Sequence, residues 1–170
     1  RGFLTDAGPD SGAFSFVHEL VRESAYETML VHNRKVIHSR TARVLEQDYP
    51  DFSAANPDVV AEHCLKAGDM DGAIRWGMAA LSRCVSDYRN EEGLEWAARL
   101  QGWIVSSVTD RGEARELEFQ ALTSKLSILE VLGRTGEAGS VLERMEELAR
   151  EQSSNLWMAW VMRHRASLLH

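Results

Sequence analysis

The chain has 170 residues, of which 44% are hydrophobic and 26% charged, enough for one helical domain or for part of a repeat array with a sizeable core. Its formal charge is −7, and residues 51–170 hold most of the excess acid, which argues against a nucleic-acid surface there. No stretch approaches the roughly 18 apolar residues that cross a bilayer, and the two cysteines suit buried thiols in a reducing cytosol. Because the chain has no initiator Met and begins with the polar RGFLTDAGPDSG, we expect a piece of a longer cytoplasmic protein.

Residues 1–50 predict one strand and two helices. Aromatic and small residues alternate over 13–17 after the turn-forming GPDSG segment, which is typical of a short strand. A helix is expected over 17–29, where apolar residues recur on one face. A second helix is predicted from about 33 to 48, ended by Pro50, with these residues on its inner face: Ile37, Thr41, Val44 and Leu45.

From Pro57 onward the sequence predicts six helices joined by turns of a few residues. Asn56 and Pro57 suit the cap and first position of the first helix, and Asp110 with Glu113 resembles a capping box. The expected helices are 57–68, 70–87, 88–108, 110–133, 135–151 and a last one from 153 or 154 onward. Such short turns make neighbouring helices antiparallel, as in a bundle or a solenoid.

Small residues favour the solenoid. Ala73, Gly93 and Ala138 each lie just inside a helix after a short polar turn, where a small side chain lets a partner helix approach closely. The pattern resembles tetratricopeptide (TPR) repeats, with these residues in packing positions: Ala61, Cys64, Ala73, Ala80, Leu122, Leu129, Ala138 and Leu142. Gly93 and Ala138 are 45 residues apart, against a usual spacing of about 34, so irregular helix pairs are expected.

The TPR resemblance implies a concave groove between two helices. Grooves of this kind bind an extended peptide or a helix of a partner protein. The residues expected to face the groove are Arg75, Met78, Ser82 and Val85 on one helix, and Gln120, Thr123, Ser127 and Glu130 on the other.

A second resemblance covers roughly residues 12–81. The segments FSFVHELVRESAYETMLVHNRKVIHSRTARVLE and VVAEHCLKAGDMDGAIRW resemble a junction in large bacterial signalling proteins, after an ATPase module of the STAND class, which is related to AAA+. Those proteins are similar to class III adenylate/guanylate cyclases and to LuxR-type or MalT-type transcription regulators. The matching residues are Phe14, Phe16, His18, Leu20, Arg22, Ala25, Tyr26, Leu30, Arg34, His38, Ala42, Leu45, Glu46, Ala61, His63, Ala67, Gly68, Ala73 and Ile74.

This resemblance implies two domains and a role for one histidine. Residues 1–50 would be the C-terminal part of a winged-helix module with one short strand, and residues 51–170 a fragment of an all-α, TPR-like superhelix of antiparallel helical hairpins. In the intact protein His18 would contact the phosphates of bound ADP, a role that suits an imidazole. The alternative is that His18 only hydrogen-bonds within the winged-helix core.

A basic run also has alternative interpretations. Arg34, Lys35, Arg40 and Arg43 occur with no acidic residue before Glu46. A solvated face and a face docked on the adjacent ATPase domain are both open. DNA binding is the least favoured interpretation, because the run lacks interleaved aromatic residues.

The sequence contains no motif for chemistry. It has no phosphate-binding loop, and His63 and Cys64 are adjacent, so they point to different faces of a helix and predict no metal site. We therefore expect no cofactor, no catalysis and no membrane or nucleic-acid binding by this fragment. The predicted function is a non-catalytic regulatory region that binds a protein or peptide. The alternatives are a free-standing TPR adaptor and an enzyme with its active site among the helices; a homodimer through the apolar last helix is also possible.

Overall fold

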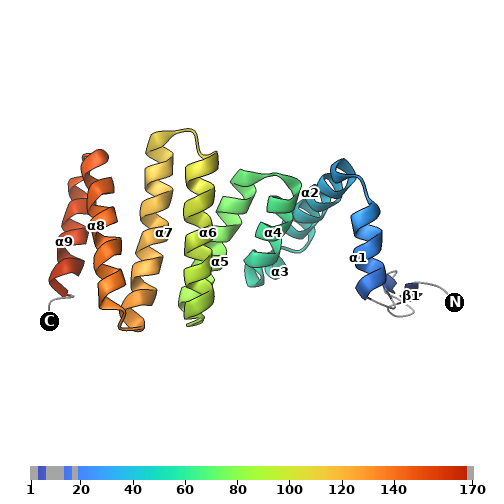
Figure 1. The fold of residues 1–170 in the computed structure, drawn as a ribbon, viewed down its shortest axis with the longest axis horizontal. Helices are drawn as coiled ribbons and strands as arrows, with labels where there is room; N and C mark the ends of the chain where they lie inside the picture. Colours follow the sequence, from blue (N-terminus) through green and yellow to red (C-terminus); the bar gives the residue numbers. More distant parts are fainter. Residues whose placement is uncertain (1–3, 7–13, 17–18, 168–170) are drawn as a thin grey trace.

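The structure is a computed structural model that describes residues 4–6, 14–16 and 19–167 (Figure 1). Helix dominates these residues, as predicted. Strands β1 (Leu4–Asp6) and β2 (Phe14–Phe16) pair antiparallel. The second lies within the predicted strand segment, whereas the first was not predicted. His18 lies outside the described residues, so its role stays a prediction.

The described helices stand side by side in one open row, with α1 at one end and α9 at the other (Figure 1). Each packs on the next from α2 onward, and α2 also packs on α4 and α5 on α7. Their bounds are α1 Glu19–Thr28, α2 Val31–Asp48, α3 Pro50–Ala55, α4 Pro57–Ala67, α5 Met70–Ser86, α6 Asn90–Ser107, α7 Arg111–Val131, α8 Thr135–Glu151 and α9 Asn155–Ser167. The six helices α4–α9 match the number and order predicted from Pro57 onward.

Local capping explains where several helices begin and end. The carboxylate of Asp69 accepts a hydrogen bond from the Gly72 amide, 3.0 Å away, and so caps α5. Helix α4 ends at Gly68, whose φ of +86° is a left-handed conformation that glycine adopts without strain. Asp110 caps α7 by accepting a hydrogen bond from the Glu113 amide at 2.8 Å. These three boundaries follow from the sequence signals.

Asn56 lies at the N-cap position of α4 and Pro57 in its first turn, as predicted, but the expected side-chain cap is not formed, and a short helix precedes Asn56. Helix α3 begins at Pro50, where the missing N–H costs no hydrogen bond, and it ends directly before Asn56. The Asn56 side-chain amide donates to the carbonyl of Phe52 at 3.0 Å, which satisfies the end of α3 and leaves the start of α4 without a side-chain cap. The sequence predicted that Pro50 would end a helix but not that it would begin another.

The core of the row is built as predicted around small residues at helix crossings. All eight residues assigned to TPR-type packing positions are buried. Gly93 lies so close to α7 that a Cβ added there would stand 2.5 Å from Cδ1 of Ile128. Ala73 packs with Cys64 of α4 and Ala42 of α2. Small side chains therefore set how closely successive helices approach.

The predicted inner face of α2 is only partly confirmed: Leu45 packs against the core cluster of α2, α4 and α5, and Thr41 is half-buried. Ile37 and Val44 are 50% and 37% exposed, whereas His38 and Ala42 are buried. Helix α2 carries apolar residues around much of its circumference, so periodicity alone does not define one inner face. The small Ala42 permits close packing on α4, and His38 takes part in a polar contact, which rotates the buried face away from Ile37.

Helix α9 completes the described row. Its Trp157 stacks on Phe119 of α7 with ring centroids 4.2 Å apart, and Val161 is buried. Leu156 and Met162 stay exposed on the other side of the helix. Dimerisation through this end stays a prediction.

The two cysteines, Cys64 and Cys84, are free and buried, as predicted. Burial raises the pKa of the Cys64 thiol to about 11, so it stays protonated and unreactive near neutral pH. Among the described helices none is both long enough and apolar enough to pass through a membrane.

Candidate interaction groove

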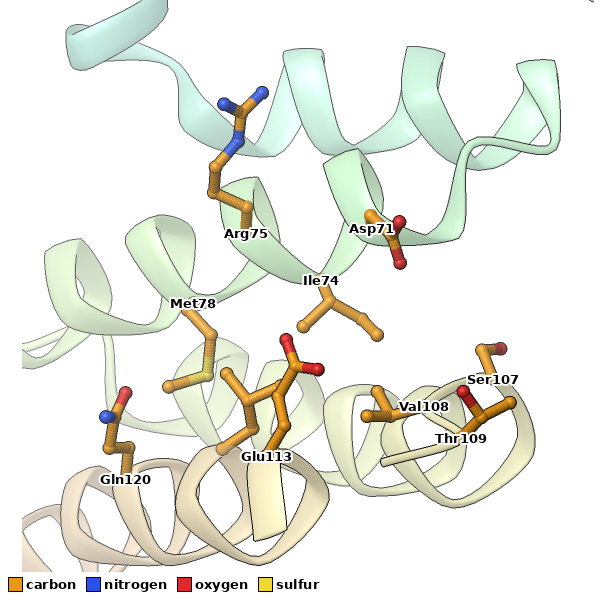
Figure 2. A pocket seen from close by; sticks show the side chains of 10 residues that line it. Asp71, Ile74, Arg75, Met78, Ser107, Val108, Thr109, Glu113 and Gln120 are labelled. Carbon is orange, nitrogen blue, oxygen red and sulfur yellow. The ribbon is translucent and has the colours of Figure 1, made fainter. Parts of the chain in front are cut away.

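A hollow of about 470 Å³ lies between α5 and α7, and the link between α6 and α7 borders one end of it (Figure 2). Because α5 and α7 are not consecutive, the hollow forms between neighbouring helical hairpins and not within a single one. Its walls are formed by Asp71, Ile74, Arg75, Met78, Ser107, Val108, Thr109, Glu113, Leu117 and Gln120.

The floor of the groove is apolar. Ile74 is buried in the core cluster shared by α5, α6 and α7, and Met78, Val108 and Leu117 pack against that cluster. Because the core fixes these side chains from below, the groove presents an apolar surface that does not have to be ordered on binding. A preformed apolar floor is what an apolar anchor residue of a partner requires.

The rim of the groove is polar and carries two carboxylates near the α6–α7 link. Figure 2 shows Asp71 at the start of α5 and Glu113 in the first turn of α7 on either side of the hollow, with Gln120 toward the other end. Neither carboxylate makes an ion pair with a described residue. An acidic rim beside an apolar floor therefore stays available to a partner.

Arg75 belongs to the wall but its charge is directed elsewhere. Its guanidinium points away from the other labelled side chains in Figure 2 and donates to Oε1 of Glu46 on α2 at 2.7 Å. The indole of Trp76 donates to the same carboxylate oxygen. Arg75 thus links α5 to α2 and does not neutralise the acidic rim.

Three of the eight predicted groove residues, Arg75, Met78 and Gln120, line this hollow. On α5, Ser82 is exposed beyond it and Val85 packs against the core. Both residues lie in the second half of α5, whereas the hollow is lined only by residues in the first half of that helix.

The remaining predicted residues of α7 serve the helix itself or face α9. The hydroxyls of Thr123 and Ser127 donate to backbone carbonyls one turn earlier, at 2.9 and 3.2 Å. Glu130 lies 3.2 Å from Nδ1 of His164 on α9. Helix α7 lies between α5 and α9. Its first half lines the groove with α5, and Glu130 in its last turn contacts α9.

The link residues and the acidic rim were missed because the prediction followed helix faces. Ser107, Val108 and Thr109 lie where α6 ends, so no helical periodicity points to them. Glu113 was interpreted as part of a capping box, yet only the Asp110 side of that box is formed and the Glu113 carboxylate borders the groove. The spacing of Asp110 and Glu113 predicted the cap correctly and could not place the second side chain.

The groove offers little for catalysis. Its wall includes two hydroxyls, of Ser107 and Thr109, but no histidine, cysteine or lysine to activate them. Elsewhere in the described part of the chain no three His, Cys, Asp or Glu side chains are grouped to hold a metal ion.

A separate polar cluster joins α1, α2 and α4. The Tyr26 hydroxyl lies 2.9 Å from Nε2 of His38, and Nδ1 of His38 lies 2.9 Å from Nδ1 of His63. Burial lowers the pKa of both imidazoles, and Lys66 lowers it further for each. When one Nδ1 atom carries a proton and donates it to the other, the three side chains form a continuous chain of hydrogen bonds.

Comparison with known proteins gives an alignment with a bacterial protein that is itself uncharacterized. An uncharacterized protein of Rhizobium meliloti (strain 1021) is 30% identical over 154 residues. The alignment covers 88% of this chain and 14% of that protein, so the chain spans only a small part of the relative's length. No family model matches the chain, and no solved structure matches it significantly.

Proposed function

We propose that this chain is a non-catalytic, protein-binding regulatory region and that the groove between α5 and α7 holds a peptide or helix of a partner. The observation that carries the proposal is the groove itself: a preformed apolar floor, a polar rim and no activated nucleophile, between two helices that are not consecutive. Binding modules need rigid apolar anchoring sites with polar edges, and these are the features present.

The chain is proposed to be part of a cytoplasmic signalling protein with an adjacent STAND-class ATPase domain, in which the helices form a TPR-like superhelix after a winged-helix remnant. The resemblance of residues 12–81 supports this context. The length of the Rhizobium protein also supports it, because there the matched region is one part of a much larger chain.

A peptide-display selection on the purified chain tests the groove. We expect selected peptides to lose most of their affinity for Gln120→Trp, because a large indole at this exposed wall position fills the hollow. Val105→Trp is the matched control, since Val105 is exposed on α6 and does not line the groove. Peptides that bind Gln120→Trp as well as the wild-type chain would show that the groove is not the binding site.

The proposed ATPase context has its own test. In the intact protein, His18→Ala is expected to accelerate ADP release if His18 contacts the nucleotide, whereas His32→Ala, at an exposed position of α2, should not. Unchanged ADP retention in His18→Ala would refute the nucleotide contact but would leave the groove proposal standing.

A further inference from the structure

A second surface, on α2, is independent of the groove. A hollow of about 410 Å³ follows the outer face of α2 and reaches Ala67 at the end of α4. The cations Lys35, Arg40 and Arg43 line it, and no acidic residue does. We call this surface the α2 basic face; it lies near the α1 end of the row (Figure 1).

The basic residues of the run 34–43 have different surroundings in the fold. Arg34 is half-buried and structural: it donates to the carbonyls of Met29 and Glu27 at 3.0 and 3.1 Å, and its guanidinium stacks on the ring of Tyr26. The Lys35 side chain extends to the end of α4. Its Nζ lies 3.5 Å from the position that a Cβ would occupy at Gly68. A cation is favourable at that C-terminus.

Arg40 and Arg43 have no such structural role. Both are exposed on α2, and neither makes an ion pair with a described residue. Most described arginines from α5 onward do pair with a carboxylate: Arg75, Arg83, Arg89, Arg99, Arg115, Arg134, Arg144, Arg150 and Arg165. Two uncompensated arginines in an acidic chain create a local positive potential that attracts an anionic partner.

Apolar side chains accompany these cations. Val36 lines the basic face and is 52% exposed. Ile37, the next residue of α2, is half exposed and lies outside the lining of the hollow. A free phosphate or a nucleic-acid backbone would cover the cations but leave these aliphatic groups in water. The excess acid of residues 51–170 further disfavours a nucleic acid.

We propose that the α2 basic face binds an acidic protein segment that also carries aliphatic or aromatic side chains. The carboxylates would pair with Arg40 and Arg43, and an apolar side chain would cover Val36 and Ile37. Complementary charge of this kind selects the partner and accelerates association, while the apolar contact slows dissociation. This surface is separate from the α5–α7 groove.

The test is a peptide-display selection on the full chain, counter-selected on the double variant Arg40→Gln/Arg43→Gln. We expect enriched peptides rich in Asp or Glu with interspersed apolar residues, whose affinity for the double variant falls about tenfold or more, the usual effect of removing close charge pairs at an interface. Arg111→Gln/Arg163→Gln is the matched control, because both arginines are exposed and make no ion pair with a described residue.

Two further arms decide between ligand classes. Random double-stranded DNA and inorganic pyrophosphate are titrated into the same chain, and weak binding that does not depend on Arg40 and Arg43 is expected. The proposal is overturned if the selection yields no acidic peptides, if acidic peptides bind the double variant equally well, or if DNA or pyrophosphate binds tightly through these arginines. Gln120→Trp should leave the acidic peptides bound, which separates this site from the groove.

Discussion

Helices α1–α3 and helices α4–α9 are held together in different ways. The later helices bury leucines almost completely in shared clusters and pair most of their arginines with glutamates. Helices α1–α3 leave Leu20, Val31 and Ile37 exposed, while the buried side chains include the polar His38 and Ser53. The Ser53 hydroxyl donates to the Leu45 carbonyl at 2.8 Å, and His38 contacts Tyr26 and His63.

The difference indicates how each part responds to change. Apolar packing is insensitive to charge and pH but intolerant of lost volume. Polar contacts between helices depend on protonation and on the presence of both partners. The row from α4 onward is therefore expected to behave as a rigid support, and the attachment of α1–α3 as the part that responds to solution conditions.

The largest expected effect is a cavity in the row. Leu129→Ala removes a fully buried side chain from the cluster of α7, α8 and α9 and should lower the free energy of unfolding by about 2–5 kcal/mol. Ile37→Ala, at a half-exposed position of α2, should change it by less than about 0.5 kcal/mol. Urea unfolding measures both, and equal losses would contradict the contrast between the two regions.

A smaller loss is expected from crowding a helix crossing. Gly93→Ala places a Cβ 2.5 Å from Cδ1 of Ile128 and 3.2 Å from the Cβ of Cys84, so the Ile128 side chain must move and the contact with Cys84 must widen slightly. We expect a loss of about 1–3 kcal/mol. Gly102→Ala, on the same helix with nothing within 4 Å, should instead stabilise by about 0.5–1 kcal/mol. Thermal unfolding measures both variants: the melting temperature should fall for Gly93→Ala and rise for Gly102→Ala.

The histidine pair predicts a stability that depends on pH. Both imidazoles have a pKa lowered from 6.5 in the folded chain, mainly by burial, although Glu62 partly opposes this at His63. Unfolded imidazoles therefore take up protons first. The stabilisation is fully present above 6.5 and is lost as the pH falls toward the lower folded values. Two protonated imidazoles would also direct N–H toward N–H across the 2.9 Å contact.

Denaturant unfolding at a series of pH values between 7.5 and 5.5 checks this, with the range chosen around the ordinary histidine pKa of about 6.5. His63→Gln should flatten the loss of stability on acidification, because it removes one of the two groups. His32→Gln, at an exposed histidine of α2, should retain the wild-type profile. A wild-type stability that rises on acidification would contradict the neutral, shared-proton pair.

The smallest effect is expected at the link between α2 and α5. Arg75→Gln removes an ion pair with Glu46 in which the arginine side chain is 68% exposed, so the loss should be about 1 kcal/mol or less. The loss should shrink in high salt, which screens exposed charges. A loss as large as that of Leu129→Ala would contradict the expectation that an exposed ion pair contributes little to the free energy of unfolding.

Much of the fold is predictable from local signals. Asp69, Gly68 and Asp110 mark helix ends through backbone hydrogen bonding and glycine geometry, and Ala73, Gly93 and Ala138 mark close crossings. Helix α3 was missed because Pro50 both follows one helix and begins another. Two residues of the predicted inner face of α2, Ile37 and Val44, were misassigned. Which residues of α2 are buried depends on contacts with distant helices, and a helical period does not contain that information.

The site was only partly predictable for the same reason. Arg75, Met78 and Gln120 lie on helix faces that the repeat pattern indicates. Val108 and Thr109 enter the groove only because the α6–α7 link folds against α5. The contact between Glu130 and His164 likewise depends on where α9 lies relative to α7.

Small-angle X-ray scattering of the purified chain tests the central claim most directly, namely that the helices form an open row that leaves a groove between α5 and α7. The account predicts an asymmetric distribution of interatomic distances with an extended tail, matching the row in Figure 1. A symmetric distribution, as given by a closed globular bundle, would contradict it.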